Sequence, residues 1–220
     1  MKTGIIVFPG SNCDRDIAYI LKEYYRHNVD FVWHKNSIEE NYDLIVIPGG
    51  FSFGDYLRCG VVAKFSPAMK SLNNHVKRGG YVLGICNGFQ ILTEAELLPG
   101  TLMRNNNLKH ICKPVYLKKG SLNNPLTEKI DEEDILEIPV SHSEGNYYAD
   151  VDTLKKLEDD NSIFFRYAIE NPNGSIDDIA GITSSDFKIA GLMPHPERAI
   201  EEWSINRDGR KIFDSFLQTI

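Results

Sequence analysis

Long hydrophobic runs are missing from this 220-residue sequence. No stretch approaches the roughly 18 uninterrupted apolar residues of a membrane-spanning helix, and the first four residues enter a strand pattern rather than a signal peptide. A C-x-x-C pair is also missing, and the spacing of the four cysteines fits neither a zinc site nor a disulfide framework; they are Cys13, Cys59, Cys86 and Cys112. We therefore expect a cytoplasmic protein with reduced thiols and no metal site.

Excess positive charge is absent as well. The chain carries 24 Lys and Arg against 31 Asp and Glu, a net charge of -7, and no basic block is larger than a pair such as Lys118-Lys119. This composition disfavours a general nucleic-acid binder. The G-x-x-x-x-G-K-S/T loop that binds ATP phosphates is missing too. The expected partners are small molecules or other proteins.

Short apolar runs and helical patterns alternate in the first half of the chain. The predicted strands are Gly4–Phe8, Phe31–Trp33, Leu44–Ile47 and the run from Tyr81 that leads to Cys86; the predicted helices are Asp14–His27 and Pro67–Arg78. Either Ser11 or Asn12 is suited to cap the first helix. This alternation predicts right-handed βαβ units, and hence an α/β fold with a parallel sheet whose functional loops lie at the carboxyl ends of the strands.

The pattern becomes strand-rich after Pro99-Gly100. The predicted elements are strands at Ile111–Leu117, Leu136–Val140, Ile163–Ile169 and Ile179–Thr183, and a last helix at Gly209–Leu217. No repeat or long linker divides the sequence. The length fits one well-buried domain, residues 1–220.

A small-residue elbow, Gly84-Ile85-Cys86-Asn87-Gly88, stands between a predicted strand and a predicted helix. Glycines on both sides permit a tight turn that exposes the central cysteine, and a helix N-terminus favours its thiolate. The pattern predicts that Cys86 is a nucleophile and the only essential thiol, since no base stands near the other three cysteines in the sequence pattern. The alternative is a buried cysteine that acts as a small hydrophobic residue.

A second cluster, Pro194-His195-Pro196-Glu197, lies near the C-terminus. Flanking prolines favour an extended backbone, in which His195 and Glu197 would lie on the same face. Histidine can then take the proton of Cys86, while the carboxylate orients the ring. The alternative is a rigid turn with a surface histidine and a glutamate that caps the next helix.

Acyl transfer also needs donors for a developing oxyanion. One candidate is the backbone amide of Asn87, directly after the nucleophile. The other comes from Gly49-Gly50, where missing side chains allow close approach to a substrate, although Pro48-Gly49-Gly50 is also compatible with an ordinary strand-ending turn.

These motifs together resemble the class I, triad-type glutamine amidotransferases, and most closely the glutaminase subunits of phosphoribosylformylglycinamidine synthase. The similar segments cover nearly the whole chain in order: Phe8–Asp14, Pro48–Tyr56, Gly84–Gln90, His142–Gly145, Asn171–Ser175 and Gly191–Arg198. One departure is Asn146, where many relatives are expected to carry an arginine.

The resemblance implies a flavodoxin-like α/β fold: an open, mostly parallel sheet with helices on both faces and a β-rich C-terminal half. It implies a Cys86-His195-Glu197 triad, oxyanion amides at Gly50 and Asn87, and glutamine contacts at Gln90 and His142. No cofactor or metal is implied in this chain.

The implied reaction releases ammonia from L-glutamine for conversion of formylglycinamide ribonucleotide to formylglycinamidine ribonucleotide in de novo purine biosynthesis. A large ATP-dependent synthetase subunit holds Mg-ATP, and a small accessory subunit completes the complex. We expect docking of the synthetase to activate the chain through the loop Gly50–Gly60, whose aromatic residues Phe51, Phe53 and Tyr56 are either interface anchors or packed inward.

Two other functions fit parts of the sequence. One is a cysteine hydrolase or stress protein of the same elbow superfamily, which acts without a synthetase. The other is a non-catalytic binding subunit, which the presence of Cys86, His195 and Glu197 disfavours.

Overall fold

The computed structural model describes residues 1–204 and 206–220. Their strands are β1 (Lys2–Val7), β2 (Asn28–Trp33), β3 (Leu44–Ile47), β4 (Tyr81–Ile85), β5 (Thr101–Met103), β6 (Ile111–Lys119), β7 (Leu136–His142), β8 (Asn146–Tyr148), β9 (Ile163–Ala168), β10 (Ile179–Thr183) and β11 (Ile189–Leu192); the helices are α1 (Asp14–Glu23), α2 (Pro67–Lys77), α3 (Asn87–Glu94), α4 (Val151–Asp159) and α5 (Asp208–Gln218). Short 3₁₀ turns connect several of them.

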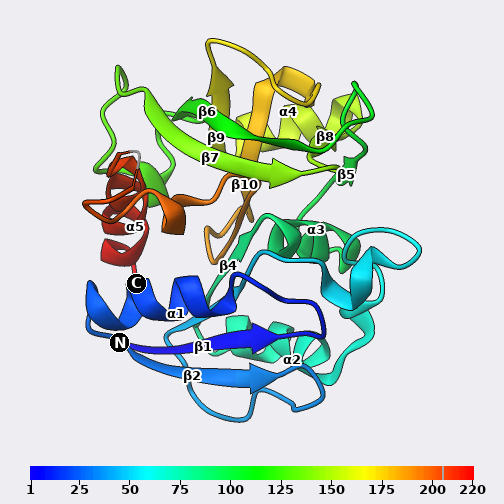
Figure 1. Ribbon diagram of the computed structural model, residues 1–220, viewed down its shortest axis with the longest axis vertical. Helices are drawn as coiled ribbons and strands as arrows, with labels where there is room; N and C mark the ends of the chain where they lie inside the picture. Colours follow the sequence, from blue (N-terminus) through cyan, green and yellow to red (C-terminus); the bar gives the residue numbers. More distant parts are fainter. Residues whose placement is uncertain (205) are drawn as a thin grey trace.

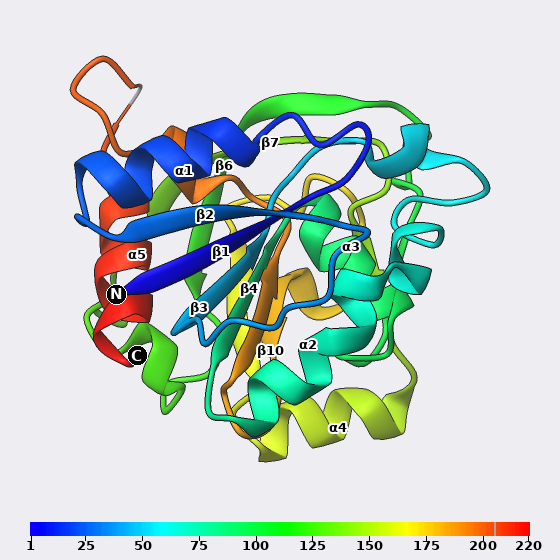
Figure 2. The same cartoon turned by 90° about the horizontal axis from the view of Figure 1, so that it is seen from below.

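Nine strands form one sheet in the order β2-β1-β3-β4-β11-β10-β9-β6-β7 (Figure 1). Neighbours from β2 to β11 are parallel, and neighbours from β11 to β7 are antiparallel. Figure 2 shows α1 and α5 on one face of the parallel region, with α2 and α3 on the other. The predicted fold class is thus confirmed, including the β-rich C-terminal half.

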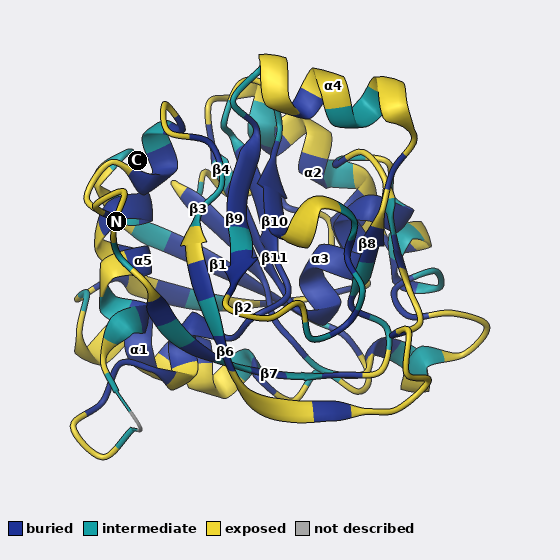
Figure 3. Ribbon diagram, turned by 90° about the horizontal axis from the view of Figure 1, so that it is seen from above, coloured by how far each residue is buried: buried dark blue, intermediate teal, exposed yellow. Residues whose placement is uncertain are grey.

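The parallel strands are the most buried part of the molecule. All four residues of β3 are buried, as expected for a strand covered by helices on both faces. Helix α3 is buried on every side, whereas the outer faces of α1 and α4 are exposed (Figure 3). Among the described residues, no helix is both long and apolar enough to cross a membrane.

Helix α1 begins at Asp14 as predicted, but its last residue and its N-terminal cap differ from the prediction. It ends at Glu23, because the chain turns through Arg26, which has φ 55°, and β2 begins three residues earlier than predicted, at Asn28. The predicted caps do not cap it. Cys13 occupies the N-cap position without a side-chain hydrogen bond, and the Ser11 hydroxyl instead accepts from the amide of Phe8, 3.0 Å away.

Helix α4 and strand β11 were not predicted. Asp150 caps α4 by accepting a hydrogen bond from the amide of Thr153, 2.8 Å away. Strand β11 is four residues long and runs directly into the Pro194–Glu197 segment, and it is the parallel neighbour of β4. This pairing brings the C-terminal cluster beside the elbow.

A separate two-stranded sheet, β5 with β8, packs against α3. Its Tyr147 is fully buried, stacks on Phe89 of α3 with ring centroids 6.1 Å apart, and donates its hydroxyl proton to the Pro99 carbonyl at 3.0 Å. This contact supports the helix that follows Cys86.

Replacement of Tyr147 by alanine should therefore lower the free energy of unfolding by about 3–5 kcal/mol, the usual cost of removing a buried aromatic side chain. Tyr148→Ala is the matched control, since the adjacent ring is 53% exposed. Urea unfolding measures both. Equal losses in the two variants would contradict the role given to the buried ring.

Candidate active site

The elbow has the geometry of a strained strand-to-helix turn. Cys86 follows β4 directly, has φ 51° and ψ −106°, and precedes the first residue of α3. A Cβ on Gly88 would lie 1.9 Å from the carbonyl oxygen of Ile47, and one on Gly84 would lie 2.7 Å from the backbone of Gly88. The glycines thus permit the close approach that the elbow requires, as the sequence predicted.

His195 and Glu197 form a buried pair. The Nδ1 atom of His195 lies 2.7 Å from Oε1 of Glu197, and the side chains are 5% and 1% exposed. The predicted extended segment is wrong, because Pro196 starts a 3₁₀ turn, Pro196–Arg198, for which its fixed φ is well suited. His195 and Glu197 still pair, because this turn brings residues two positions apart in the sequence close to each other. A hydrogen bond of 2.8 Å from the His195 amide to the Pro139 carbonyl ties the segment to β7.

Cys86 lies near enough to His195 to affect the pKa of the ring, and its Sγ donates a hydrogen bond to the Ser141 carbonyl, 3.6 Å away. Burial alone lowers the pKa of His195, but the negative charges of Glu197 and Cys86 outweigh it and raise this pKa well above its usual value. Glu197 and Cys86 therefore favour the imidazolium form of His195. A charged imidazole beside a thiol is suited to the activation of a cysteine nucleophile.

The two candidate oxyanion amides lie on neighbouring elements. Among the described residues, neither the backbone amide of Gly50 nor that of Asn87 has a hydrogen-bond partner. Gly50 has φ 148°, and a Cβ there would lie 2.8 Å from the amide nitrogen of Asn12. The side chain of Asn87 accepts a hydrogen bond from the amide of Ser52 at 3.1 Å, which joins the Gly50 loop to α3. The oxyanion role of both amides stays a prediction.

Gln90 is buried and hydrogen-bonded on both ends of its amide. It donates to the Glu144 carbonyl at 2.6 Å and accepts from the side chain of Asn87 at 2.8 Å. These bonds join α3 to the segment after β7. A contact between Gln90 and glutamine stays a prediction.

His142, at the end of β7, is 3% exposed. Its Nδ1 lies 3.1 Å from Oδ1 of Asn105, while its Nε2 has no partner among the described residues. Burial lowers its pKa to about 4, and the nearby charges of His195 and His110 add to this effect. His142 is therefore neutral at pH 7. Its predicted substrate contact stays a prediction.

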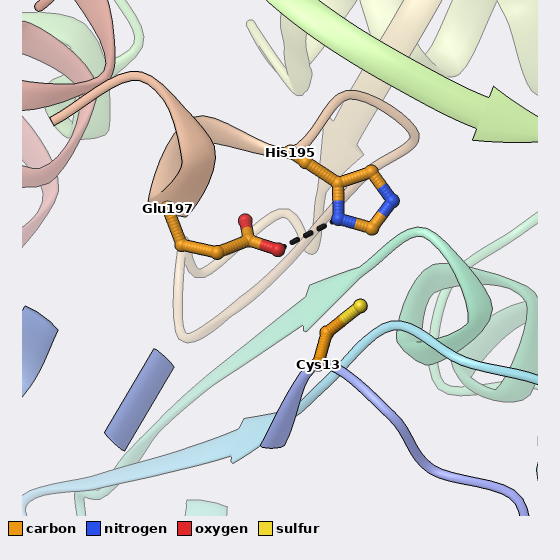
Figure 4. A group of neighbouring side chains, drawn as sticks. All are labelled: Cys13, His195 and Glu197. Carbon is orange, nitrogen blue, oxygen red and sulfur yellow. Dashed lines mark hydrogen bonds and ion pairs between the residues drawn. The ribbon is translucent and has the colours of Figure 1, made fainter. Parts of the chain in front are cut away.

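The position of Cys13 in the candidate site is not predicted by the sequence. It is buried beside the His195–Glu197 pair, and potential ligand atoms of the three residues lie within 4.8 Å of one another (Figure 4). These are the side chains that could hold a metal ion, but the hydrogen bond between Nδ1 and Oε1 already uses one nitrogen and one oxygen of the set. The sequence pattern shows no base near Cys13, but the fold places His195 beside it. The order of the strands would have predicted this proximity, because the carboxyl ends of β1, β3 and β4 meet at one edge of the sheet.

Comparison with known proteins agrees with this geometry. The family model of the CobB/CobQ-like glutamine amidotransferase domain matches residues 1–215. The chain belongs to this family. It is 56% identical over 217 residues to phosphoribosylformylglycinamidine synthase subunit PurQ from two strains of Leptospira interrogans, with 99% of each chain covered.

Solved structures support the same family. A chain in the structure of PurLQS from Thermotoga maritima has a TM-score of 0.87 and 39% identity, and the alignment covers 99% of this chain and 98% of that one. A putative GMP synthase subunit from Thermoplasma acidophilum, at a TM-score of 0.66, 15% identity and coverage of 99% and 93%, shows the fold alone. The resemblance to class I glutamine amidotransferases of the PurQ type is thus confirmed.

Buried His142 should make the stability of this family member depend on pH. Its folded-state pKa of about 4 lies below the ordinary 6.5, so stability is full above pH 6.5 and is lost as the pH falls towards 4. The linkage amounts to about 2 kcal/mol between pH 7 and pH 5. Urea unfolding at these two pH values gives the free energy of unfolding, which should fall by about 2 kcal/mol less in His142→Gln than in the wild-type protein. An equal fall in both proteins would contradict the neutral, buried state of His142.

Proposed function

We propose that this chain is the glutaminase subunit of phosphoribosylformylglycinamidine synthase. It hydrolyses L-glutamine to glutamate and ammonia, and passes the ammonia to an ATP-dependent synthetase subunit that converts formylglycinamide ribonucleotide to formylglycinamidine ribonucleotide in de novo purine biosynthesis. The observation that carries this proposal is 56% identity to PurQ over 99% of both chains. The buried Cys86, His195 and Glu197 supply the required chemistry.

In the proposed mechanism, the thiolate of Cys86 attacks the side-chain carbonyl carbon of glutamine. His195 delivers a proton to the departing ammonia, and a water then hydrolyses the thioester as the same ring accepts the proton of that water. Glu197 holds the ring through Nδ1 and stabilises its charged form. The amides of Gly50 and Asn87 stabilise the oxyanion.

The proposed partners follow from the division of labour. This sequence has no ATP-binding loop, so Mg-ATP belongs on the synthetase, and we assign no cofactor to this chain. A related chain occurs in the structure of PurLQS, which supports a complex with a synthetase and a small accessory subunit. We place the chain in the cytoplasm, where its free thiols stay reduced, and treat residues 1–220 as one domain.

Triad variants should show graded losses of glutaminase activity. Cys86→Ala should abolish glutamate production, because the thioester cannot form. His195→Ala should cost about a hundred- to ten-thousand-fold in kcat, as for other general acids and bases. Glu197→Gln should cost less, since it leaves the imidazole in place. Glutamate release by the assembled complex measures all three variants.

Cys112→Ala is the control for the triad variants, since this thiol is exposed on β6. Glutamine hydrolysis that persists in Cys86→Ala, or a larger loss in Glu197→Gln than in His195→Ala, contradicts the assigned roles.

The loop Gly50–Gly60 offers a route for activation by the synthetase. Phe51 and Tyr56 are 47% and 70% exposed, whereas Phe53 is partly buried against His34, with ring centroids 5.1 Å apart. The expectation of exposed anchors therefore fits Phe51 and Tyr56, and Phe53 packs inward. Phe53, Asp55 and Leu57 all have positive φ values, a backbone state that stores strain in non-glycine residues.

We expect glutaminase activity to be low in the isolated chain and to rise on addition of the synthetase. Tyr56→Ala should lower this stimulation about tenfold, as for an aromatic interface anchor. Phe31→Ala on the edge strand β2, where the ring is 50% exposed, is the matched control. Glutamate production with and without partner tests the proposal. Equal rates would refute partner gating, and full stimulation of Tyr56→Ala would exclude this loop from it.

A further inference from the structure

Cys13 is a buried thiol that the proposed mechanism does not use. It is 4% exposed, and its sulfur points towards the imidazole of His195 (Figure 4). Its Sγ donates a hydrogen bond to Oδ1 of Asn12 at 3.4 Å and lies within 4.8 Å of a ring nitrogen of His195. His195 therefore lies beside two thiols, and only Cys86 stands on the nucleophile elbow.

Hydrogen bonds fix both Cys13 and the arginine that contacts its sulfur. The Cys13 amide donates to the Gly49 carbonyl at the end of β3, 3.2 Å away. Arg198, on the turn that carries Glu197, donates from Nη2 to Sγ at 3.2 Å. The same nitrogen donates to Oδ2 of Asp16, in the first turn of α1, at 3.0 Å. The sulfur thus lies where α1, β3 and the catalytic turn meet.

The space around the ring requires a small neighbour at Gly49. A Cβ on Gly49 would lie 2.6 Å from Cε1 of His195 and 3.2 Å from Sγ of Cys13. The imidazole and the sulfur therefore occupy the volume that a side chain at residue 49 would need. Glu197 bonds to the ring only at Nδ1. Other contacts must therefore limit rotation of the ring about that hydrogen bond.

We propose that Cys13 is a positioning residue for His195, with its sulfur holding the imidazole towards Cys86 and Arg198 holding the sulfur. Cys13 acts through the ring and does not touch the substrate. The inference rests on the proposed glutaminase function, in which misplacement of a catalytic group by about 1 Å can cost a hundredfold in rate.

Cys13→Ala should lower kcat for glutamine about ten- to hundred-fold, with KM changed by less than about twofold, because the ring loses a contact and the substrate loses none. Cys13→Ser should recover part of this loss, since a hydroxyl can also accept from Arg198. Cys112→Ser is the matched control and should have wild-type values. The pH profile of kcat/KM should shift in Cys13→Ala, an effect that lost packing alone does not produce.

The rate of Cys86 alkylation by iodoacetamide, followed against pH and located by peptide mass spectrometry, tests the positioning without glutamine. We expect slower alkylation in Cys13→Ala, with its pH midpoint moved upwards, because a misplaced imidazolium supports the thiolate less. If the wild-type chain in complex with the synthetase hydrolyses no glutamine, the proposed function fails, while alkylation still reports on the positioning. If circular dichroism shows that Cys13→Ala is unfolded, the same measurements on Cys13→Ser decide the proposal. A folded variant with the alkylation rate and pH profile of the wild-type protein overturns it.

Discussion

The close approach of Gly88 to the carbonyl oxygen of Ile47 is the contact on which the site depends. With only 1.9 Å between that oxygen and an added Cβ, α3 can lie against the end of β3 only because residue 88 has no side chain. This approach places the elbow beside the loop that carries Gly50. Cys86 and both candidate oxyanion amides thus occupy neighbouring strand ends, and the parallel pairing of β4 with β11 adds His195 from the far end of the chain.

Burial gives the His195–Glu197 pair its chemical character. A buried ion pair contributes little to stability, because loss of hydration offsets the attraction between the charges. Removing one partner leaves the other charge buried and uncompensated. The Oε2 atom of Glu197 has no hydrogen-bond partner among the described residues, so the carboxylate directs its hydrogen bonding to Nδ1 through Oε1. An incompletely satisfied buried group of this kind is typical of a functional site rather than of a structural ion pair.

Local sequence patterns predicted the elements that create the site, but not all of its contacts. The glycines around Cys86 and the all-apolar β3 are local signals, and both were interpreted correctly. The 3₁₀ turn after His195 was missed, because Pro196 fits an extended backbone and the first position of a helical turn equally well. The place of Cys13 depends on strand order, and the Asn105–His142 contact joins residues 37 apart. No single-residue pattern encodes either one.

A continuous set of hydrogen bonds connects the exposed loop to the predicted glutamine site. The Ser52 amide donates to the Asn87 side chain, the Asn87 side chain donates to Gln90, and Gln90 donates to the Glu144 carbonyl. The carboxylate of Glu144 in turn accepts a hydrogen bond from the amide of Cys59 in the loop, 3.4 Å away. The segment between Ser52 and Cys59 is therefore bonded at both ends to groups beside the elbow, and Gly50 lies just before its first attachment. The proposed gating therefore needs no distant conformational change, since the strained segment that carries Tyr56 is bonded to the side chain of Asn87, whose amide is a candidate oxyanion donor.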